Sequence, residues 1–489
     1  MTSLAIWDNR FAAAIAAYLA ACLLLGGASA AGVLANLLLQ LVAIGIIWWA
    51  VLRLSGTRIE GLTRSAIWLL LAILILPLLQ LIPLPTDIWT GLPGRGTIAD
   101  DYTRLGVGLP ILGISLSPER TIASWLALLP PTAIFLATLS LPEKSRVTMV
   151  YAVVAIAFVS IIVGFLQVTS QGSGLYPYVI TNIGSAVGFF SNRNHLASFL
   201  LMAIPFLTLL LRSAGNIDLP RTSLLGRRIL VAGCLIILSV GIFFTGSRAG
   251  LLLLVPTLGL TYLTMLRTSR GFTPQFLGLG IVGLLIMVVS VMAYSPFYER
   301  IVERSENFQN DVRYWTAPIS LDAAWQNFPV GTGIGTFDPV FRRAAGDTNL
   351  GPNFINHAHN DYLELMMTGG LPAILLVLGV VLWGAAVVRS NWQMKSGNPS
   401  ALSRASSIII VIALLHSAVD YPLRTAAIAA LFAAACAFQL APLAPRGSLA
   451  PDPTPMPHRR SVGLTDMRVG KRSRRSAAPG HGSVRSSER

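Results

Sequence analysis

Stretches of roughly twenty apolar residues, each long enough to cross a ~30 Å hydrocarbon core, recur along most of this sequence. We count about twelve of them. Hydrophobic residues make up 54% of the chain and charged residues only 12%, and the mean hydropathy is +0.67. A soluble domain carries about twice that charged fraction. Alternating strand patterns are absent, and backbone groups in lipid must be bonded within each segment, so the spanning elements are helices. The sequence therefore predicts an all-α integral membrane protein.

The apolar stretches divide the chain into three regions. We predict N-terminal transmembrane helices over 1–180, a second membrane region over 181–442, and a disordered tail over 443–489 that is rich in Pro, Ser and Gly. One long polar loop, residues 295–360, separates spans nine and ten. The predicted spans are 11–31, 33–54, 66–85, 121–141, 147–169, 195–211, 229–245, 249–267, 275–294, 365–389, 405–419 and 424–442.

Loop charge predicts the orientation. If the N-terminus is cytoplasmic, every loop on that side is basic, as the positive-inside rule expects. The tail adds ten Lys and Arg residues against three acidic ones, and it can contact anionic lipid. The net charge of +15 thus follows from topology. We expect no nucleic-acid partner, because no folded basic module accompanies the tail. The predicted inside-loop cations are Arg53, Arg58, Arg64, Lys144, Arg146, Arg212, Arg221, Arg227, Arg228, Arg267, Arg270, Arg389, Lys395 and Arg404.

The end of the first apolar stretch allows two interpretations. The segment Gly26–Gly32 resembles a signal-peptidase site, with small residues at Ala28 and Ala30. Asp8 offsets Arg10, so the preceding region is weakly basic, and we favour an uncleaved first helix. The three cysteines all fall inside predicted spans without metal-ligand spacing, which indicates apolar packing. They are Cys22, Cys234 and Cys436.

Polar residues collect at the outward ends of the predicted spans. The string NHAHNDYLELMMTGG, residues 356–370, places two histidines where the long loop meets an apolar helix. Ionisable groups at a membrane boundary are costly and indicate function. Arg313 lies near the start of an amphipathic pattern over Val312–Trp325, with Trp315, Ile319, Ala323 and Gln326 on one face. The other members of the set are Arg193, Asn194, His195, Arg248, His357, His359, Asn360, Asp361, Asp420 and Arg424.

These residue types suit transfer of a sugar from a pyrophosphate. The arginine fork binds phosphate oxygens and stays charged, so Arg248, Arg313 and Arg193 are candidate pyrophosphate ligands. A histidine can accept the proton of an attacking hydroxyl. His359 is the preferred base, with His357 and Asp361 beside it as further catalytic candidates. Asn360 and Asp361 suit the first turn of a helix. Asn194, His195 and Asn360 are expected to support the site.

Structural roles compete with these assignments. Arg193 can snorkel at the interface, Arg313 can be solvated surface, and His357 can orient the loop. We interpret His195 as packing or hydrogen bonding, His416 as hydrogen-bonded in the bundle, and Asp420 with Arg424 as an ion pair. An H-x-H pair near an acid can bind a metal, but the arginines already supply positive charge. We therefore expect neither a metal nor another cofactor.

Four segments resemble the superfamily of O-antigen ligases and polysaccharide polymerases. They are GFFSNRNHLASFLL, FFTGSRAGLLLL, DVRYW…FPVGTGIGTF and HAHNDYLELMMTGGLPAILL, in the order that the family shows, within residues 180–385. The resemblance implies a GT-C-like fold in the bacterial inner membrane and a catalytic region over 181–442. It also implies an undecaprenyl-pyrophosphate-linked glycan as donor, used at the periplasmic face.

The resemblance assigns roles to particular residues and leaves the acceptor open. Arg248 matches the family's SR motif, Arg313 its loop arginine and His359 its histidine before asparagine. The family's E-x-G acid is missing where this sequence reads Met367-Thr368-Gly369-Gly370. A ligase would use lipid A-core as acceptor, a polymerase a growing polysaccharide, and some relatives use protein. A multi-span transporter or flippase is the alternative of another class; it would show related halves and charges near the midplane.

Overall fold

The computed structural model describes residues 2–29, 34–170, 172–179, 181–207, 209, 224–268, 312–346, 355–393 and 401–443. The described residues form helices and no strand; a single isolated bridge joins Leu84 to Leu112. The prediction of an all-α protein is confirmed. Contacts divide the chain into the units Met1–Arg446 and Gly447–Arg489, and the second unit lies outside the described residues.

Five helices among the described residues are long and apolar enough to cross a membrane, as expected of a membrane protein. They are α2 (Leu34–Ser55), α3 (Gly61–Gln80), the pair α6 (Pro118–Leu126) and α7 (Leu129–Leu139), α8 (Glu143–Thr169) and α17 (Asp361–Gln393). Shorter apolar segments lie in α1 (Thr2–Leu25), α11 (Leu224–Thr245), α12 (Arg248–Thr268), α18 (Ala401–Ser417) and α19 (Ala426–Phe438). The total of about twelve spans stays a prediction, and the expected span 275–294 lies outside the described residues.

One predicted span is interrupted. We expected a helix over 195–211, but α9 (Arg193–Ala203) gives way to a 3₁₀ turn, η1 (Ile204–Phe206). Pro205 sits in that turn. Proline has no N–H to donate to the preceding helical turn, so the α-helix ends before it.

Helix α17 is kinked at Gly370, and its backbone around the kink forms hydrogen bonds with the glycine-rich turn at residues 329–335. Gly370 has φ +60°, and a Cβ there would lie 2.2 Å from the carbonyl oxygen of Pro329. The break lets the backbone N–H of Leu371 donate to Pro329 at 2.8 Å. The N–H of Gly333 donates in turn to the carbonyl of Thr368, also at 2.8 Å. The glycine-rich turn is therefore fixed to α17.

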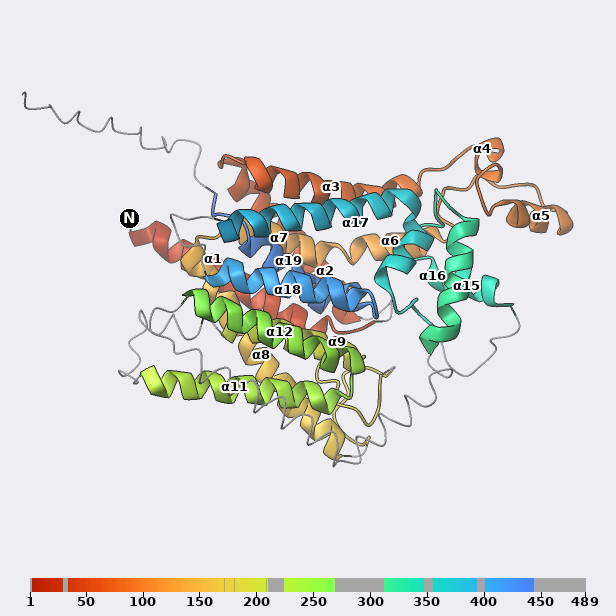
Figure 1. The fold of residues 1–489 in the computed structure, drawn as a ribbon. Helices are drawn as coiled ribbons and strands as arrows, with labels where there is room; N and C mark the ends of the chain where they lie inside the picture. Colours follow the sequence, from red (N-terminus) through yellow and green to blue (C-terminus); the bar gives the residue numbers. More distant parts are fainter. Residues whose placement is uncertain are drawn as a thin grey trace, which may run out of the picture. The chain divides into compact units, whose positions relative to one another are not determined.

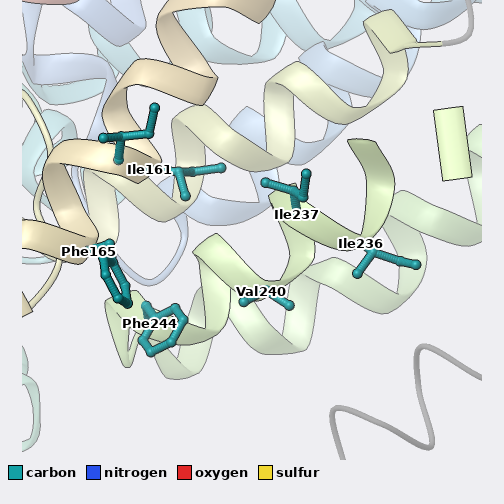
Figure 2. Close-up of a pocket in the computed structure, with 7 residues that line it drawn as sticks. Ile161, Phe165, Ile236, Ile237, Val240 and Phe244 are labelled. Atoms are coloured by element: carbon teal, nitrogen blue, oxygen red, sulfur yellow. The ribbon is translucent and has the colours of Figure 1, made fainter. Parts of the chain in front are cut away.

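Helices α8 and α11 leave an apolar groove of about 330 Å³ on the bundle. Figure 2 shows the side chains that line it. Phe244 is the last of the lining residues in the sequence, and it lies four residues before Arg248. The lining residues are Ile161, Ile162, Phe165, Ile236, Ile237, Val240 and Phe244.

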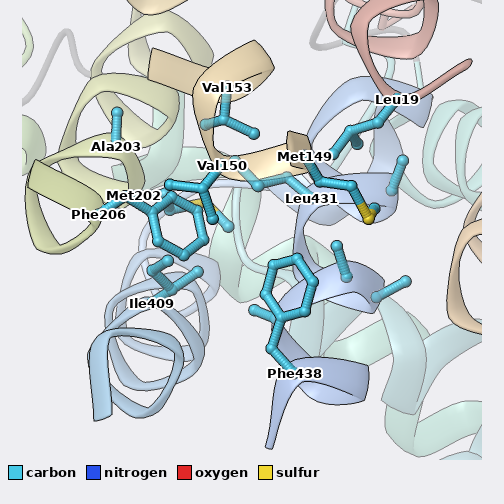
Figure 3. Close-up of a cluster of buried hydrophobic side chains, with 14 of the residues drawn as sticks. Leu19, Met149, Val150, Val153, Met202, Ala203, Phe206, Ile409, Leu431 and Phe438 are labelled. Atoms are coloured by element: carbon cyan, nitrogen blue, oxygen red, sulfur yellow. The ribbon is translucent and has the colours of Figure 1, made fainter. Parts of the chain in front are cut away.

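The interior is built from apolar side chains of α1, α8, η1, α18 and α19. Figure 3 shows Leu19, Met149, Phe206, Ile409 and Phe438 within one cluster. Other apolar side chains face outward, including Trp68 of α3, which is 65% exposed. A helix that is apolar on all sides is expected where one face packs and the other meets lipid.

Short helices gather at one end of the long ones (Figure 1): α4 (Thr86–Thr90), α5 (Gly96–Arg104), α15 (Val312–Gln326) and α16 (Phe337–Ala345). Helix α15 packs on α16 and α17. Its inner face carries Trp315, Ile319 and Ala323 in a small apolar cluster, which confirms the predicted amphipathic helix. Gln326, expected on the same face, is exposed.

Two predicted loop cations are buried rather than on the surface: Arg404 is 7% exposed, and Arg146 is buried more deeply. Arg146 is 1% exposed. Its Nε donates to the carbonyl of Leu141 at 3.1 Å, and its Nη1 donates to those of Ala437 and Leu440 at 3.2 and 2.7 Å. These carbonyls lie at or just beyond the C-terminal ends of α7 and α19, where backbone acceptors lack helical partners. Arg146 thus joins two helix ends.

Candidate active site

His359 lies immediately before α17 and pairs with a buried acid. Its Nδ1 is 3.0 Å from Oδ1 of Asp420, which is 0% exposed. A carboxylate only accepts, so Nδ1 carries the proton and Nε2 is the nitrogen available to a substrate. Among the described residues, His359 is the only non-glycine residue with positive φ, +52°. Such backbone conformations persist where surrounding structure holds them, often at active sites.

Asp420 stays charged despite its burial. Burial by itself would raise the pKa of Asp420, but the hydrogen bond from His359 outweighs burial, together with smaller electrostatic contributions from His195, His359 and Arg313. The pKa of Asp420 therefore lies below its ordinary value. We expected Asp420 to pair with Arg424; it pairs with His359 instead.

His357 has a different environment from His359. Its Nδ1 lies 3.0 Å from Oε1 of Glu364, and its Nε2 lies 3.3 Å from the carbonyl oxygen of Ser29. Both partners only accept hydrogen bonds, so His357 satisfies both when it carries two protons. Neither nitrogen is then left to take a proton from a substrate. The contacts favour the orienting role for His357.

Arg424 joins two acids of α17. Its Nε donates to Oδ1 of Asp361 at 3.0 Å, and its Nη1 lies 3.0 Å from Oε1 of Glu364. Burial alone would lower the pKa of Arg424, but the two carboxylates raise it above its ordinary value. Asp361 therefore contacts an arginine rather than a histidine. Asn360 caps the same helix, since its Oδ1 accepts from the N–H groups of Tyr362 and Leu363 at 3.0 and 3.1 Å.

Tyr421 lies between three imidazole rings. Its ring centroid is 4.3 Å from that of His357, 4.9 Å from that of His359 and 5.0 Å from that of His195. Burial raises the pKa of Tyr421 above its ordinary value. We had not singled out Tyr421 or Glu364 in the sequence. Glu364 could have been found from its position in an apolar helix, because burying a carboxylate is costly unless a partner such as an arginine or histidine pairs with it.

The residues of α9 border the same cluster. His195 is fully buried against Tyr421, as expected for a packing role. The backbone N–H of Asn194 donates to Oδ1 of Asn192, which caps α9. His416 is hydrogen-bonded in the bundle, as predicted: its Nδ1 lies 2.6 Å from Oγ of Ser198.

The three arginines occupy two places. Nη1 of Arg193 lies 3.8 Å from the position of a Cβ at Gly246. That glycine belongs to the turn between α11 and α12, and Arg248 is the first residue of α12. Arg193 and Arg248 therefore border one turn. Arg313, at the start of α15, acts instead on Asp420.

Residues 233–378 match the family model described as O-antigen ligase. The chain carries a domain of the O-antigen ligase family. Among proteins of curated function, none matches the chain significantly. The family resemblance read from the sequence is thus confirmed for a segment that contains Arg248, Arg313, His357 and His359.

The O-antigen ligase domain does not contain the whole cluster. Asp420, Tyr421 and Arg424 follow the matched segment, and Ser29 and His195 precede it. Hydrogen bonds and ring contacts nevertheless bind the domain's histidines to these residues. Residues outside the O-antigen ligase domain, chiefly in the loops after α1 and between α18 and α19, therefore hold its histidines.

His357 and His359 are the candidate metal ligands of the O-antigen ligase domain. Within the described ranges, no three His, Cys, Asp or Glu side chains come together in a way that could hold a metal ion. The two histidines each engage a separate acid. Metal-independent chemistry stays a prediction.

Proposed function

We propose that this protein is a glycosyltransferase that moves a glycan from undecaprenyl pyrophosphate to a hydroxyl of lipid A-core or of a growing polysaccharide. The observation that carries the proposal is the contact between His359 and the buried Asp420, within reach of the charge of Arg313. An imidazole held by a carboxylate at Nδ1 presents Nε2 as a proton acceptor.

In the proposed transfer step, His359 acts as the base for the acceptor while the arginines stabilise the leaving pyrophosphate. Nε2 of His359 takes the proton of the acceptor hydroxyl while the hydroxyl oxygen forms a bond to the anomeric carbon. The bond from that carbon to the pyrophosphate oxygen breaks, and the pyrophosphate leaves with the electron pair. Asp420 stabilises the imidazolium that results. Arg248 and Arg313 stabilise the charge that develops on the leaving group.

The donor's two ends meet different surfaces. Arg193 and Arg248 border the turn that follows Phe244, and they bind pyrophosphate in this proposal. Phe244 is the last residue in the sequence that lines the apolar groove between α8 and α11 (Figure 2). The groove takes part of the polyprenyl tail, because an apolar groove beside cations fits a lipid with an anionic head.

Surface polysaccharide from the producing bacterium tests the function. Deletion of the gene should leave long undecaprenyl-linked chains without attachment if the protein is a ligase. It should leave single repeat units if the protein is a polymerase. Gel electrophoresis of the lipid-linked and surface material distinguishes the two results, and unchanged polysaccharide would refute glycan transfer by this chain.

Topology is the second expectation. We place the protein in the inner membrane, with α15 and α16 in the periplasm and the tail in the cytoplasm, because the opposite loops are basic. Cysteine at Ala344, an exposed residue of α16, should react with an impermeant thiol reagent in intact spheroplasts. Cysteine at Gly56, which is exposed with open space around its Cβ position, should react only after lysis. The reverse labelling pattern would place the site in the cytoplasm and end the proposal.

A further inference from the structure

Helix α15 presents an apolar and aromatic stripe on its outer face. Tyr314, Pro318, Leu321 and Trp325 are spaced by four, three and four residues, so they share one side of the helix. Tyr314 is 57% exposed, Leu321 is 43% exposed and Trp325 is 59% exposed. The opposite face packs in the apolar cluster described above. Large exposed aromatic residues in a row indicate a binding surface.

The stripe is turned away from the long helices. Helix α15 runs across the end of the bundle (Figure 1), and its inner face packs on α16 and α17. The opposite face therefore points away from α16 and α17 and is left exposed. This placement favours a soluble ligand over lipid.

Polar groups accompany the aromatic rings. Nε2 of Gln326 donates to Oδ2 of Asp322 at 2.6 Å, and both side chains flank Trp325. The ring of Trp325 is held edge-to-face against Phe328, with centroids 5.5 Å apart. A sugar ring has a C–H face that stacks on an aromatic ring and hydroxyls that bond amides and carboxylates. The stripe offers both kinds of contact.

We infer that the outer face of α15 binds the glycan of the lipid-linked donor. The inference rests on the proposed function, and it adds a subsite for the sugars beyond the reacting one. The stripe begins beside Arg313, whose charge acts on the catalytic pair. It extends from Tyr314 to Trp325, which is twelve residues and about 16 Å along the helix, so it has room for more than one sugar unit. The surface would therefore sense glycan length.

The test compares two donors with the full-length protein in lipid nanodiscs. One donor carries a single sugar on undecaprenyl pyrophosphate, and the other carries the complete glycan. Trp325→Ala and Tyr314→Ala should each raise KM for the complete donor about three- to tenfold, the range for one aromatic contact, without changing kcat. KM for the single-sugar donor should not change. Trp325→Phe should retain most of the affinity, and Trp68→Ala, at an exposed tryptophan of α3, should have no effect.

Other outcomes would distinguish failure of the glycan subsite from failure of the proposed transferase function. Unchanged KM for the complete donor, or an equal rise for both donors, overturns the glycan subsite while the transferase stands. Glycan released from the donor by mild acid provides a binding test without transfer. If wild type binds it, Trp325→Ala does not, and neither transfers, the subsite stands and the proposed function fails. A fluorophore at Leu321→Cys that doxyl-labelled lipid quenches would place the stripe in the membrane and overturn the inference.

Discussion

Replacement of His359 by alanine should lower the rate of glycan transfer by about 10²–10⁴-fold, the usual contribution of a general base. Nδ1 of His359 is fixed on Asp420 at 3.0 Å, which leaves Nε2 to accept the proton. The lipid-linked donor should still bind, because the proposed pyrophosphate ligands are arginines. Transfer and donor binding should be measured separately with purified protein.

The backbone at His359 requires a second variant. Because φ is +52° there, alanine removes the imidazole and also suits the conformation poorly. Asparagine adopts positive φ more readily, so His359→Asn isolates loss of the base. Both variants should show the same large loss of rate. Recovery of activity in His359→Asn would show that the loop conformation matters and the imidazole does not.

His357→Ala provides the comparison at the neighbouring histidine. It removes the contacts to Glu364 and Ser29 but no proton acceptor, so its effect on transfer should be milder. Normal transfer by His359→Ala together with lost transfer by His357→Ala would exchange the two roles. Normal transfer by both would refute a histidine base.

Arg248→Lys should remain impaired by about 10²-fold although it keeps the charge, because lysine cannot form the bidentate fork that a pyrophosphate accepts. Arg313→Lys should behave similarly. The matched control is Arg64→Lys, at an exposed residue of α3 in a predicted cytoplasmic loop. Rates should be measured at equal amounts of folded protein. Near-normal polysaccharide in both Arg248→Ala and Arg313→Ala would rule out leaving-group stabilisation by these arginines.

Local patterns in the sequence predicted much of the helical framework. Hydropathy placed α11 and α12 on either side of the turn before Arg248, and periodicity placed Trp315, Ile319 and Ala323 on the packed face of α15. These features depend on neighbouring residues, which a single sequence displays. The 3₁₀ turn around Pro205 shows that hydropathy did not reveal an interruption inside a predicted span.

The pairings in the site could not be read in the same way. Hydropathy placed His359 and Asp420 at the same side of the membrane, but it contained nothing to choose between His359 and Arg424 as the partner of Asp420. The acid expected near Met367 was missing, while Glu364, one helical turn earlier, engages His357 and Arg424. Such choices depend on three-dimensional packing between segments far apart in sequence.

The contact between His357 and Ser29 joins positions 328 residues apart. Asp420 and Arg424 come from the connection between the last two described helices, α18 and α19, and Ser29 follows the first helix. Membrane insertion of a nascent chain proceeds from the N-terminus, so the histidines emerge before their acid and arginine partners. The site closes only when α19 has packed beside α1. A partly inserted chain would therefore lack the aligned pair of His359 and Asp420, so the geometry of the site depends on assembly of the whole bundle.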